Sequence, residues 1–309
     1  MSLIAGVDEV GRGPLAGPVV AGAVVLPEEH GIDGLRDSKK LTRKKREALY
    51  PIIISKALGI GIGEASVGKI DEINIREATF LAMDRALMNL PMVPDKALVD
   101  GEALRSQKIP NEGVIKGDDK IDSIKAASII AKVTRDRMMV HYGKIFPEYG
   151  FEKHSGYGTK THMEALRTYK ATPIHRRSFA PVKKQMPTIN WLKENNRISW
   201  MCEKLAGLYL VGKNYKILKI EHDNSRGNSI SIYAEDPNNK TIYAVVKESN
   251  SDNSENKVLE FLKREEVQNL KGTIGYHLDE DDIDQRFDLI TVQFVKNNSP
   301  LIKHFKGII

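Results

Sequence analysis

The pattern of apolar and polar positions divides the first part of the chain into strands and helices. Apolar residues over 3–7 and 19–26, separated by a Gly-rich corner, predict two strands that lie side by side. Apolar positions recur every three to four residues between 70 and 90, which predicts a long helix. Further helices are expected over 43–56, 121–142 and 160–169, and further strands over 58–65 and 97–100. This pattern predicts an α/β fold, a mixed sheet flanked by helices.

A second, shorter series of elements follows a linker at 183–187. Helices are expected over 191–211 and 254–270, and strands over 215–221, 229–234, 241–247 and 287–295. We therefore expect two domains, one over 1–186 and a smaller α/β domain over 187–309.

The composition is that of a globular protein. Of the 309 residues, 41% are hydrophobic and 28% are charged. The apolar run Val19–Leu26 is too short to cross a bilayer, and the chain does not open with an export signal. The single cysteine, Cys202, excludes an internal disulfide and a multi-cysteine zinc site. We expect a cytoplasmic protein with no membrane partner.

Positive charge is concentrated in the first part of the chain. Residues 1–186 contain 30 Lys and Arg against 23 Asp and Glu, whereas 187–309 contain 17 against 18. A basic excess favours an anionic partner such as nucleic acid, and here it belongs entirely to the first predicted domain. The two domains are therefore expected to have different roles.

Four acidic residues stand at the ends of predicted elements rather than on solvated faces. They are Asp8, Glu9, Asp100 and Asp118. Asp8 and Asp100 follow apolar strands directly, at the sheet edge where α/β proteins usually bind ligands. Clustered carboxylates repel one another without a cation, and Mg²⁺ or Mn²⁺ prefers oxygen ligands of this kind. The group predicts a metal site, although Asp118 taken alone is equally well explained as a helix cap.

The acids lie within motifs that resemble, in sequence, order and spacing, those of the ribonuclease HII family. The motifs are DEVGRGPLAGPV at 8–19, DSKKL at 37–41, VDG at 99–101, KGD at 116–118, AASIIAKVTRD at 126–136, GYGT at 156–159 and HRRSFAPV at 175–182. The resemblance extends over 1–186. One departure is Ser155, where the family usually has a lysine.

This resemblance implies a ribonuclease-H-like fold and a metal site made by the same four acids. It also implies hydrolysis of the RNA strand of RNA/DNA hybrids, and incision at a ribonucleotide within duplex DNA. Such cleavage would use two metal ions and leave 5′-phosphate and 3′-hydroxyl ends. Asp136 is expected to support the site, although a surface ion pair with Lys132 four residues earlier explains it equally well.

Substrate contacts are expected in three places along the sequence. Backbone groups of the glycine corner can bond to a 2′-hydroxyl, the group that distinguishes RNA from DNA. By resemblance, Tyr157 stacks on the following deoxyribose and so favours an RNA-to-DNA junction. Basic and hydroxyl side chains are expected to contact phosphates, which position the duplex without reading its sequence. The residues concerned are Gly11, Arg12, Gly13, Lys39, Tyr157, Arg176 and Ser178.

Two rival functions are weaker. Glycines 11, 13 and 17 superficially match a dinucleotide-binding fingerprint, but that fingerprint needs a helix next. Here two prolines and an apolar strand follow instead. A non-catalytic hybrid-binding protein on the same fold is the other alternative, and the intact acids argue against it.

The smaller domain resembles a family of small, restriction-endonuclease-like proteins in three stretches. These are 203–210, 215–218 and 286–290. In active nucleases of that fold, two strands carry acids beside a lysine; here Ser231 and Val245 occupy the acidic positions and Lys247 remains. A site without carboxylates holds Mg²⁺ poorly. We expect an accessory, non-catalytic domain that binds DNA or docks a protein partner.

Overall fold

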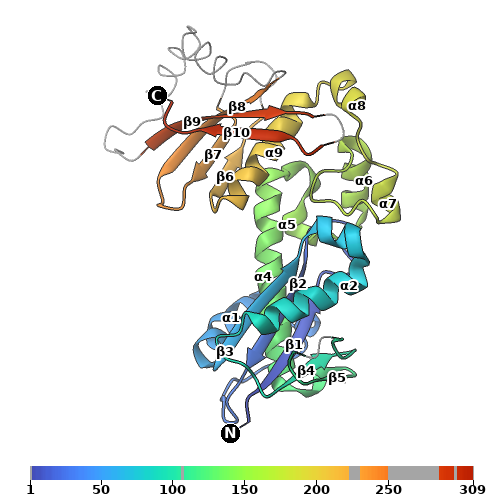
Figure 1. Cartoon of the computed structure of the whole chain (residues 1–309), viewed down its shortest axis with the longest axis vertical. Helices are drawn as coiled ribbons and strands as arrows, with labels where there is room; N and C mark the ends of the chain where they lie inside the picture. Colours follow the sequence, from blue (N-terminus) through green and yellow to red (C-terminus); the bar gives the residue numbers. More distant parts are fainter. Residues whose placement is uncertain (1, 106–107, 223–229, 250–284, 296–297, 309) are drawn as a thin grey trace. The chain divides into compact units, whose positions relative to one another are not determined.

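The computed structural model describes residues 2–105, 108–222, 230–249, 285–295 and 298–308. The chain divides into two compact units, each built on a five-stranded sheet (Figure 1). The first unit contains residues 1–140 and 148–186, and the second contains 141–147 and 187–309.

The sheet of the first unit brings two acidic positions onto neighbouring strands. Its order is β3-β2-β1-β4-β5. The strands are β1 (Ile4–Val10), β2 (Val19–Val25), β3 (Gly59–Ala65), β4 (Lys96–Asp100) and β5 (Asn111–Val114). The first three are antiparallel, whereas β4 and β5 run parallel to β1. Because β1 and β4 are parallel, residues near their carboxyl ends meet at one edge of the sheet.

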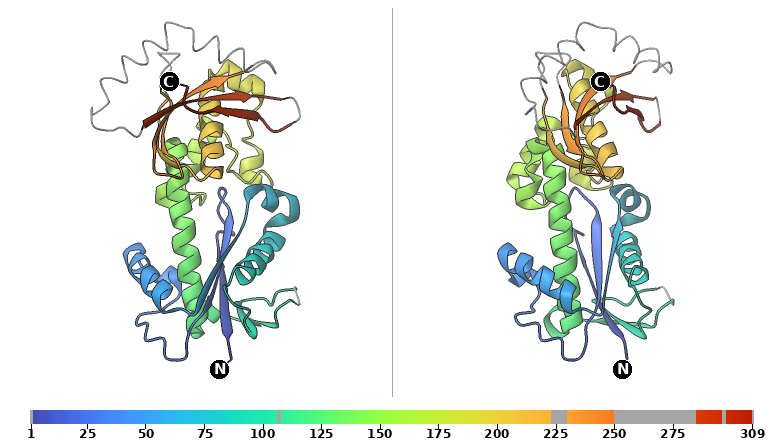
Figure 2. Two further views of the ribbon diagram at one scale, coloured as in Figure 1. Left: turned by 60° about the vertical axis from the view of Figure 1, so that its left-hand side comes forward. Right: turned by 90° about the vertical axis from the view of Figure 1, so that its left-hand side faces the viewer.

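Helices cover both faces of this sheet (Figures 1 and 2). The helix α2 (Val67–Met88) packs on one face, and α1 (Arg43–Lys56) and α4 (Asp122–Ile145) pack on the other. Small residues let α4 approach closely, since a Cβ at Gly22 would lie 2.6 Å from the Ala127 carbonyl oxygen. The shorter helices are α3 (Gly117–Lys120), α5 (Phe151–His154), α6 (Lys160–Tyr169) and α7 (Ala180–Lys183).

Local sequence explains where these helices start and where they are interrupted. The bounds of α1 and α6 agree with the predicted 43–56 and 160–169, and Thr42 caps α1 by accepting a hydrogen bond from the Lys45 amide. The predicted helix over 70–90 starts earlier and is interrupted at Asn74, where φ is 68°. The Asn74 side chain accepts from the Arg76 amide at 2.9 Å and so caps the part that follows.

The strand β5 was not predicted, because its NEGV sequence lacks an apolar pattern.

The second unit is a sheet with order β10-β9-β8-β7-β6, packed against α9. Its elements are α8 (Ile189–Glu194), α9 (Ile198–Gly212), β6 (Lys216–Ile220), β7 (Ile232–Glu235), β8 (Thr241–Glu248), β9 (Gln285–Gln293) and β10 (Leu301–Phe305). The single helix predicted over 191–211 is therefore two helices, with Asn196 at a φ of 53° between them. The strand expected to be the last, over 287–295, is followed by β10. The helix predicted over 254–270 lies outside the described residues.

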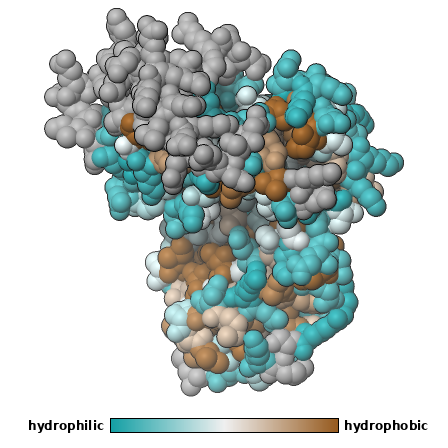
Figure 3. All heavy atoms as spheres, turned by 45° about the horizontal axis from the view of Figure 1, so that its top comes forward, coloured by the Kyte–Doolittle hydropathy of each residue, from teal (hydrophilic) through white to brown (hydrophobic). Residues whose placement is uncertain are grey.

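In the part of the chain that the structure describes, no helix is long and apolar enough to cross a membrane. The face drawn in Figure 3 is mainly hydrophilic, with separate hydrophobic patches.

Candidate active site

Three of the four predicted metal ligands converge at the edge of the first sheet. Asp8 lies near the end of β1, Asp100 ends β4, and Asp118 belongs to α3. One carboxylate oxygen of each lies within 4.8 Å of the other two. Asp8 and Asp118 are buried, with 3% and 8% of their surface exposed. Three buried or half-buried acids at this spacing form a set of hard oxygen donors that fits Mg²⁺ or Mn²⁺.

The fourth acid, Glu9, lies beside this group. It pairs with Arg12 at 3.6 Å and, together with Asp100, lines a hollow of about 120 Å³. Consecutive strand residues point to opposite faces, which explains why Glu9 and Asp8 enter the region from different sides. Glu9 is therefore placed at the border of the acid group.

Backbone hydrogen bonds fix the acids in place. Lys116 turns the chain with a φ of 56°, and this turn aims two amides at the Asp100 carboxylate. The Gly117 amide donates to Asp100 Oδ1 at 2.7 Å, and the Asp118 amide donates at 3.3 Å. Lys116 is the N-cap of α3, so Asp118 lies inside this short helix, four residues before the start of α4 at Asp122.

Ser128 supports Asp8 and was not anticipated from the sequence. Its hydroxyl lies 2.8 Å from that of Ser38 and hydrogen-bonds the Asp8 carboxylate. Asp8 also accepts from the Glu9 amide at 2.7 Å. Ser128 lies in the AASIIAKVTRD motif, but it is not among the residues predicted to form the site.

The acids repel one another electrostatically. Burial raises the pKa of Asp8 well above its ordinary value, and the charges of Glu9 and Asp100 raise it further. Burial also raises the pKa of Asp118, with Asp100 and Asp37 adding to the effect. A cation between the carboxylates would remove this repulsion, so the charges of the site favour metal binding.

Lys39, one of the basic residues predicted to contact the substrate, lies next to the acid group. Its Nζ lies 3.5 Å from Asp118 Oδ2, and its side chain is 75% exposed. Partial burial opposes the charge on Lys39, but the neighbouring Asp8, Asp37 and Asp118 outweigh it and raise its pKa. Lys39 thus presents a positive charge to solvent next to the acids.

The glycine corner and Tyr157 lie together. We use "glycine corner" for residues 11–17, the turn between β1 and β2. A Cβ at Gly13 would lie 3.5 Å from Cε1 of the Tyr157 ring, which is 44% exposed. The Leu15 amide donates to the Gly156 carbonyl at 2.8 Å and ties the two turns together. Arg12 also belongs to the corner. Its side chain is 54% exposed and forms an ion pair with Glu9.

Arg176 does not lie where a phosphate contact requires. Its side chain is fully buried, and its guanidinium donates to backbone carbonyls of the glycine corner. The prediction of a phosphate contact for Arg176 is therefore corrected: the residue supports the corner from within. Ser178 is exposed, and its hydroxyl donates to Asp71 Oδ1 at 2.7 Å.

Asp136 lies outside the group of three acids and has its own partners. It contacts Lys132 Nζ at 2.6 Å and Arg46 Nη2 at 3.4 Å. The Ser155 hydroxyl, at the position where the ribonuclease HII family usually has lysine, donates to it at 2.9 Å. These contacts favour the ion pair with Lys132, but the pair is largely buried and does not lie on the surface as expected.

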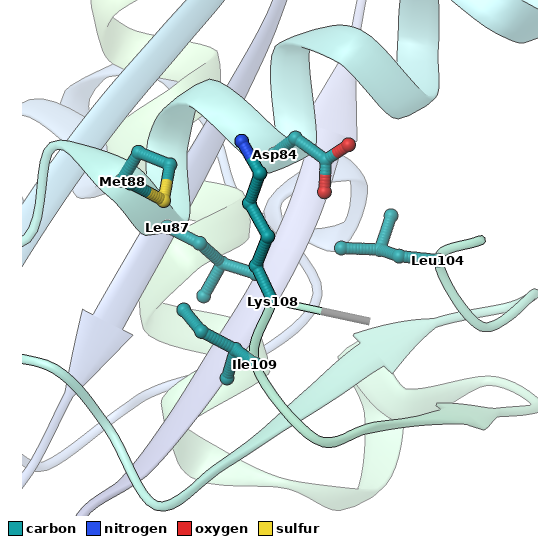
Figure 4. A pocket seen from close by; sticks show the side chains of 6 residues that line it. All are labelled: Asp84, Leu87, Met88, Leu104, Lys108 and Ile109. Atoms are coloured by element: carbon teal, nitrogen blue, oxygen red, sulfur yellow. The ribbon is translucent and has the colours of Figure 1, made fainter. Parts of the chain in front are cut away.

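A second hollow of the first unit is lined mainly by apolar residues. Figure 4 shows it lined by Asp84, Leu87, Met88, Leu104, Lys108 and Ile109. Burial raises the pKa of Asp84, and the charge of Lys108 opposes this shift. None of the residues predicted to bind metal or substrate lines this hollow.

The mixed sheet, the helices on its faces and the acids at its edge define a nuclease of the ribonuclease-H-like class. The model of the ribonuclease HII family matches residues 5–182. Ribonuclease HII of Bacillus cytotoxicus is 58% identical over 183 residues, which are 59% of this chain and 70% of the relative. That of Bacillus subtilis is 58% identical over 181 residues, covering 59% and 71%.

Solved structures agree with this class. The ribonuclease H2 of Pyrococcus horikoshii superimposes with a TM-score of 0.51 and 31% identity, over 59% of this chain and 95% of the other. A complex of PCNA and ribonuclease HII from Archaeoglobus fulgidus gives 0.50 and 26%, over 61% and 99%. The chain belongs to the ribonuclease HII family, whose members are metal-dependent hydrolases. The family match ends before residue 187, where the second unit resumes.

Proposed function

We propose that the chain is an endoribonuclease that hydrolyses the RNA strand of RNA/DNA hybrids and cuts at ribonucleotides embedded in duplex DNA. The observation that carries the proposal is the convergence of Asp8, Asp100 and Asp118 within 4.8 Å at one sheet edge. Membership of the ribonuclease HII family supports the substrate class.

The chemistry follows from what these residues can hold. Asp8, Asp100 and Asp118, with Glu9 at their border, would bind two Mg²⁺ or Mn²⁺ ions. Bound ions of this kind activate water and stabilise the leaving oxygen in phosphodiester hydrolysis. Water adds to the phosphorus and the bond to the 3′ oxygen breaks, which gives a 5′-phosphate and a 3′-hydroxyl.

Other residues bind and orient the duplex. Lys39 offers an exposed positive charge to a phosphate near the acids. The exposed Ser178 would have to turn its hydroxyl from Asp71 to donate to a phosphate. Backbone groups of the corner at Gly11, Arg12 and Gly13 meet the 2′-hydroxyl, while the exposed Tyr157 ring stacks on the next sugar. The 3.5 Å spacing between a Cβ at Gly13 and that ring supports joint recognition of one RNA-to-DNA junction.

A cleavage assay on matched duplexes tests the proposal. The duplexes contain no ribonucleotide, one, or several, and each is incubated with and without Mg²⁺ or Mn²⁺. We expect metal-dependent cuts only where ribonucleotides are present, and cleavage of the all-DNA duplex would contradict the proposal. Asp8→Asn should abolish cleavage while the protein still binds the hybrid.

For the second unit we propose an accessory role without catalysis. Ser231 and Val245 are buried at the positions where restriction-endonuclease-like enzymes carry acids. Glu203 is also buried and is held by His222 at 2.8 Å. Among the residues that the structure describes, no group of metal-binding side chains lies in this unit. Its function would then be to bind DNA or to dock a protein partner.

Hybrid affinity separates these two roles. Charge reversal of the exposed Lys219 and the half-buried Lys240, Lys→Glu at both, should weaken hybrid binding if the unit contacts DNA. Unchanged affinity and unchanged salt dependence would leave partner docking as the role of the unit.

A further inference from the structure

Two arginine side chains are buried beneath the glycine corner. Arg135 on α4 and Arg176 after α6 both have 0% of their surface exposed. A guanidinium group in a protein interior must use its hydrogen-bond donors, because burying an unpaired charge is costly. The positions of its acceptors therefore show which part of the backbone each arginine fixes.

Arg176 joins the two ends of the glycine corner. Its Nη1 donates to the Arg12 carbonyl at 2.8 Å and its Nε donates to the Gly17 carbonyl at 3.0 Å. Its Nη2 also donates to the carbonyls of Gly11 and Pro18. The planar guanidinium thus holds both sides of the turn between β1 and β2 at a fixed spacing.

Arg135 joins the corner to the turn that carries Tyr157. Its Nε donates to the Pro18 carbonyl at 2.9 Å and its Nη2 donates to the Ala16 carbonyl at 3.0 Å. Its Nη1 donates to the Ser155 carbonyl at 2.9 Å, two residues before Tyr157. One side chain therefore spans both elements that are proposed to sense the sugar.

The two arginines are costly to bury side by side. Burial lowers the pKa of Arg176 to about 9, and the neighbouring charge of Arg135 contributes to the shift. Apolar side chains could fill the same volume without this cost. What apolar residues could not supply is a rigid fork of donors that fixes several carbonyls at once.

We infer that Arg135 and Arg176 are positioning residues that hold the glycine corner and the Tyr157 turn as one rigid sensor of the RNA-to-DNA junction. This inference rests on the proposed function of the site. Neither arginine reaches solvent, so neither touches the substrate; they act through the backbone that they fix.

The cut position tests this inference on the full-length protein. Arg176→Lys and Arg135→Lys keep the positive charge but remove the fork. The substrate is a duplex with a run of several ribonucleotides, whose cut sites are mapped at single-nucleotide resolution. Ile53→Ala is the matched control, because it creates a cavity in the fully buried core under α1 and touches neither turn.

We expect both lysine variants to cut along the run instead of at the junction, as Tyr157→Ala should. Misplacement of a recognition element by about 1 Å can lower the rate about 100-fold, so kcat at the junction should fall by about tenfold to 100-fold. KM should change little, since Lys39 still contacts phosphate. Combining Arg176→Lys with Tyr157→Ala should give less than the product of the two effects, because both act on one sensor.

The alternative outcomes are distinguishable. If the lysine variants cut at the junction like the wild type, and their activity falls only with the folded fraction as in Ile53→Ala, the arginines are merely structural and the inference is wrong. A wild type that cuts no ribonucleotide-containing duplex would refute the proposed function instead. If Arg176→Lys does not fold, Arg135→Lys decides, because it leaves the Arg176 contacts in place.

Discussion

Neutralising one acid of the metal site should stabilise the protein in the absence of metal. The change is Asp8→Asn, which keeps the side-chain shape and removes one charge. Asp8 faces Asp100 and Asp118, with carboxylate oxygens within 4.8 Å of each other. Two unit charges at that distance repel by about 3.5 kcal/mol at an effective dielectric constant of roughly 20.

Two effects reduce this gain. The raised pKa of Asp8 shows that proton binding already relieves part of the repulsion. The asparagine oxygen also accepts weaker hydrogen bonds than a carboxylate from the Glu9 amide and from Ser128, at about 1 kcal/mol for each bond. We therefore expect a net gain of about 1 kcal/mol, or about 2–4 °C in the unfolding temperature of a unit of this size.

Thermal unfolding in excess EDTA and in saturating Mg²⁺ measures this effect. Without metal Asp8→Asn should unfold at the higher temperature, and with Mg²⁺ the order should reverse because the wild type binds the ion more tightly. Asp119→Asn is the control, since Asp119 is exposed, pairs with Lys40 and lies outside the acid group. An Asp8→Asn protein that is less stable than the wild type in EDTA would refute the reasoning.

Three further predictions follow from the same region. The pKa values of Asp8 and Asp118 are raised on folding. The metal-free protein should therefore lose stability as the pH rises from about 4 through the raised values. The affinity for Mg²⁺, measured by calorimetry, should fall as the pH drops through the same values. Gly11→Ala should unfold at a lower temperature and lose junction cleavage, because φ is 97° and the new Cβ would lie 2.3 Å from Arg135 Nε; a variant with normal activity would show that the corner is not rigid. Tyr157→Ala should lose junction cleavage far more than stability, since its ring is 44% exposed, and equal losses in cleavage and unfolding assays would contradict its role in stacking.

Local signals in the sequence were sufficient to predict much of the fold and the acid group. Thr42 marks the start of α1 because a threonine hydroxyl caps a helix without help from distant residues. Asp8 and Asp100 could be placed together because each follows an apolar strand of a mixed sheet. Both features depend on neighbours in the sequence or on a general property of α/β sheets.

The roles of Arg176, Ser128 and Asn74 could not be predicted in the same way. A basic run predicts exposure, whereas Arg176 is buried because carbonyls more than 150 residues away accept hydrogen bonds from its guanidinium. Ser128 acquires its role only when α4 packs on the sheet next to Ser38. Asn74 interrupts α2 through a backbone conformation that the apolar period does not encode. The roles of Arg176 and Ser128 depend on tertiary contacts that single-sequence patterns do not contain.

The division of α4 between the two units limits how the nuclease can be separated from its accessory part. Residues 141–147 belong to the second unit, where Ile145 and Phe146 are fully buried. Ile145 packs against α9, since a Cβ at Gly207 would lie 3.3 Å from its Cγ2. Cleavage of the chain near residue 186 would therefore not yield an intact first unit. The fragment that contains it would also carry the end of α4, whose buried apolar residues would become exposed.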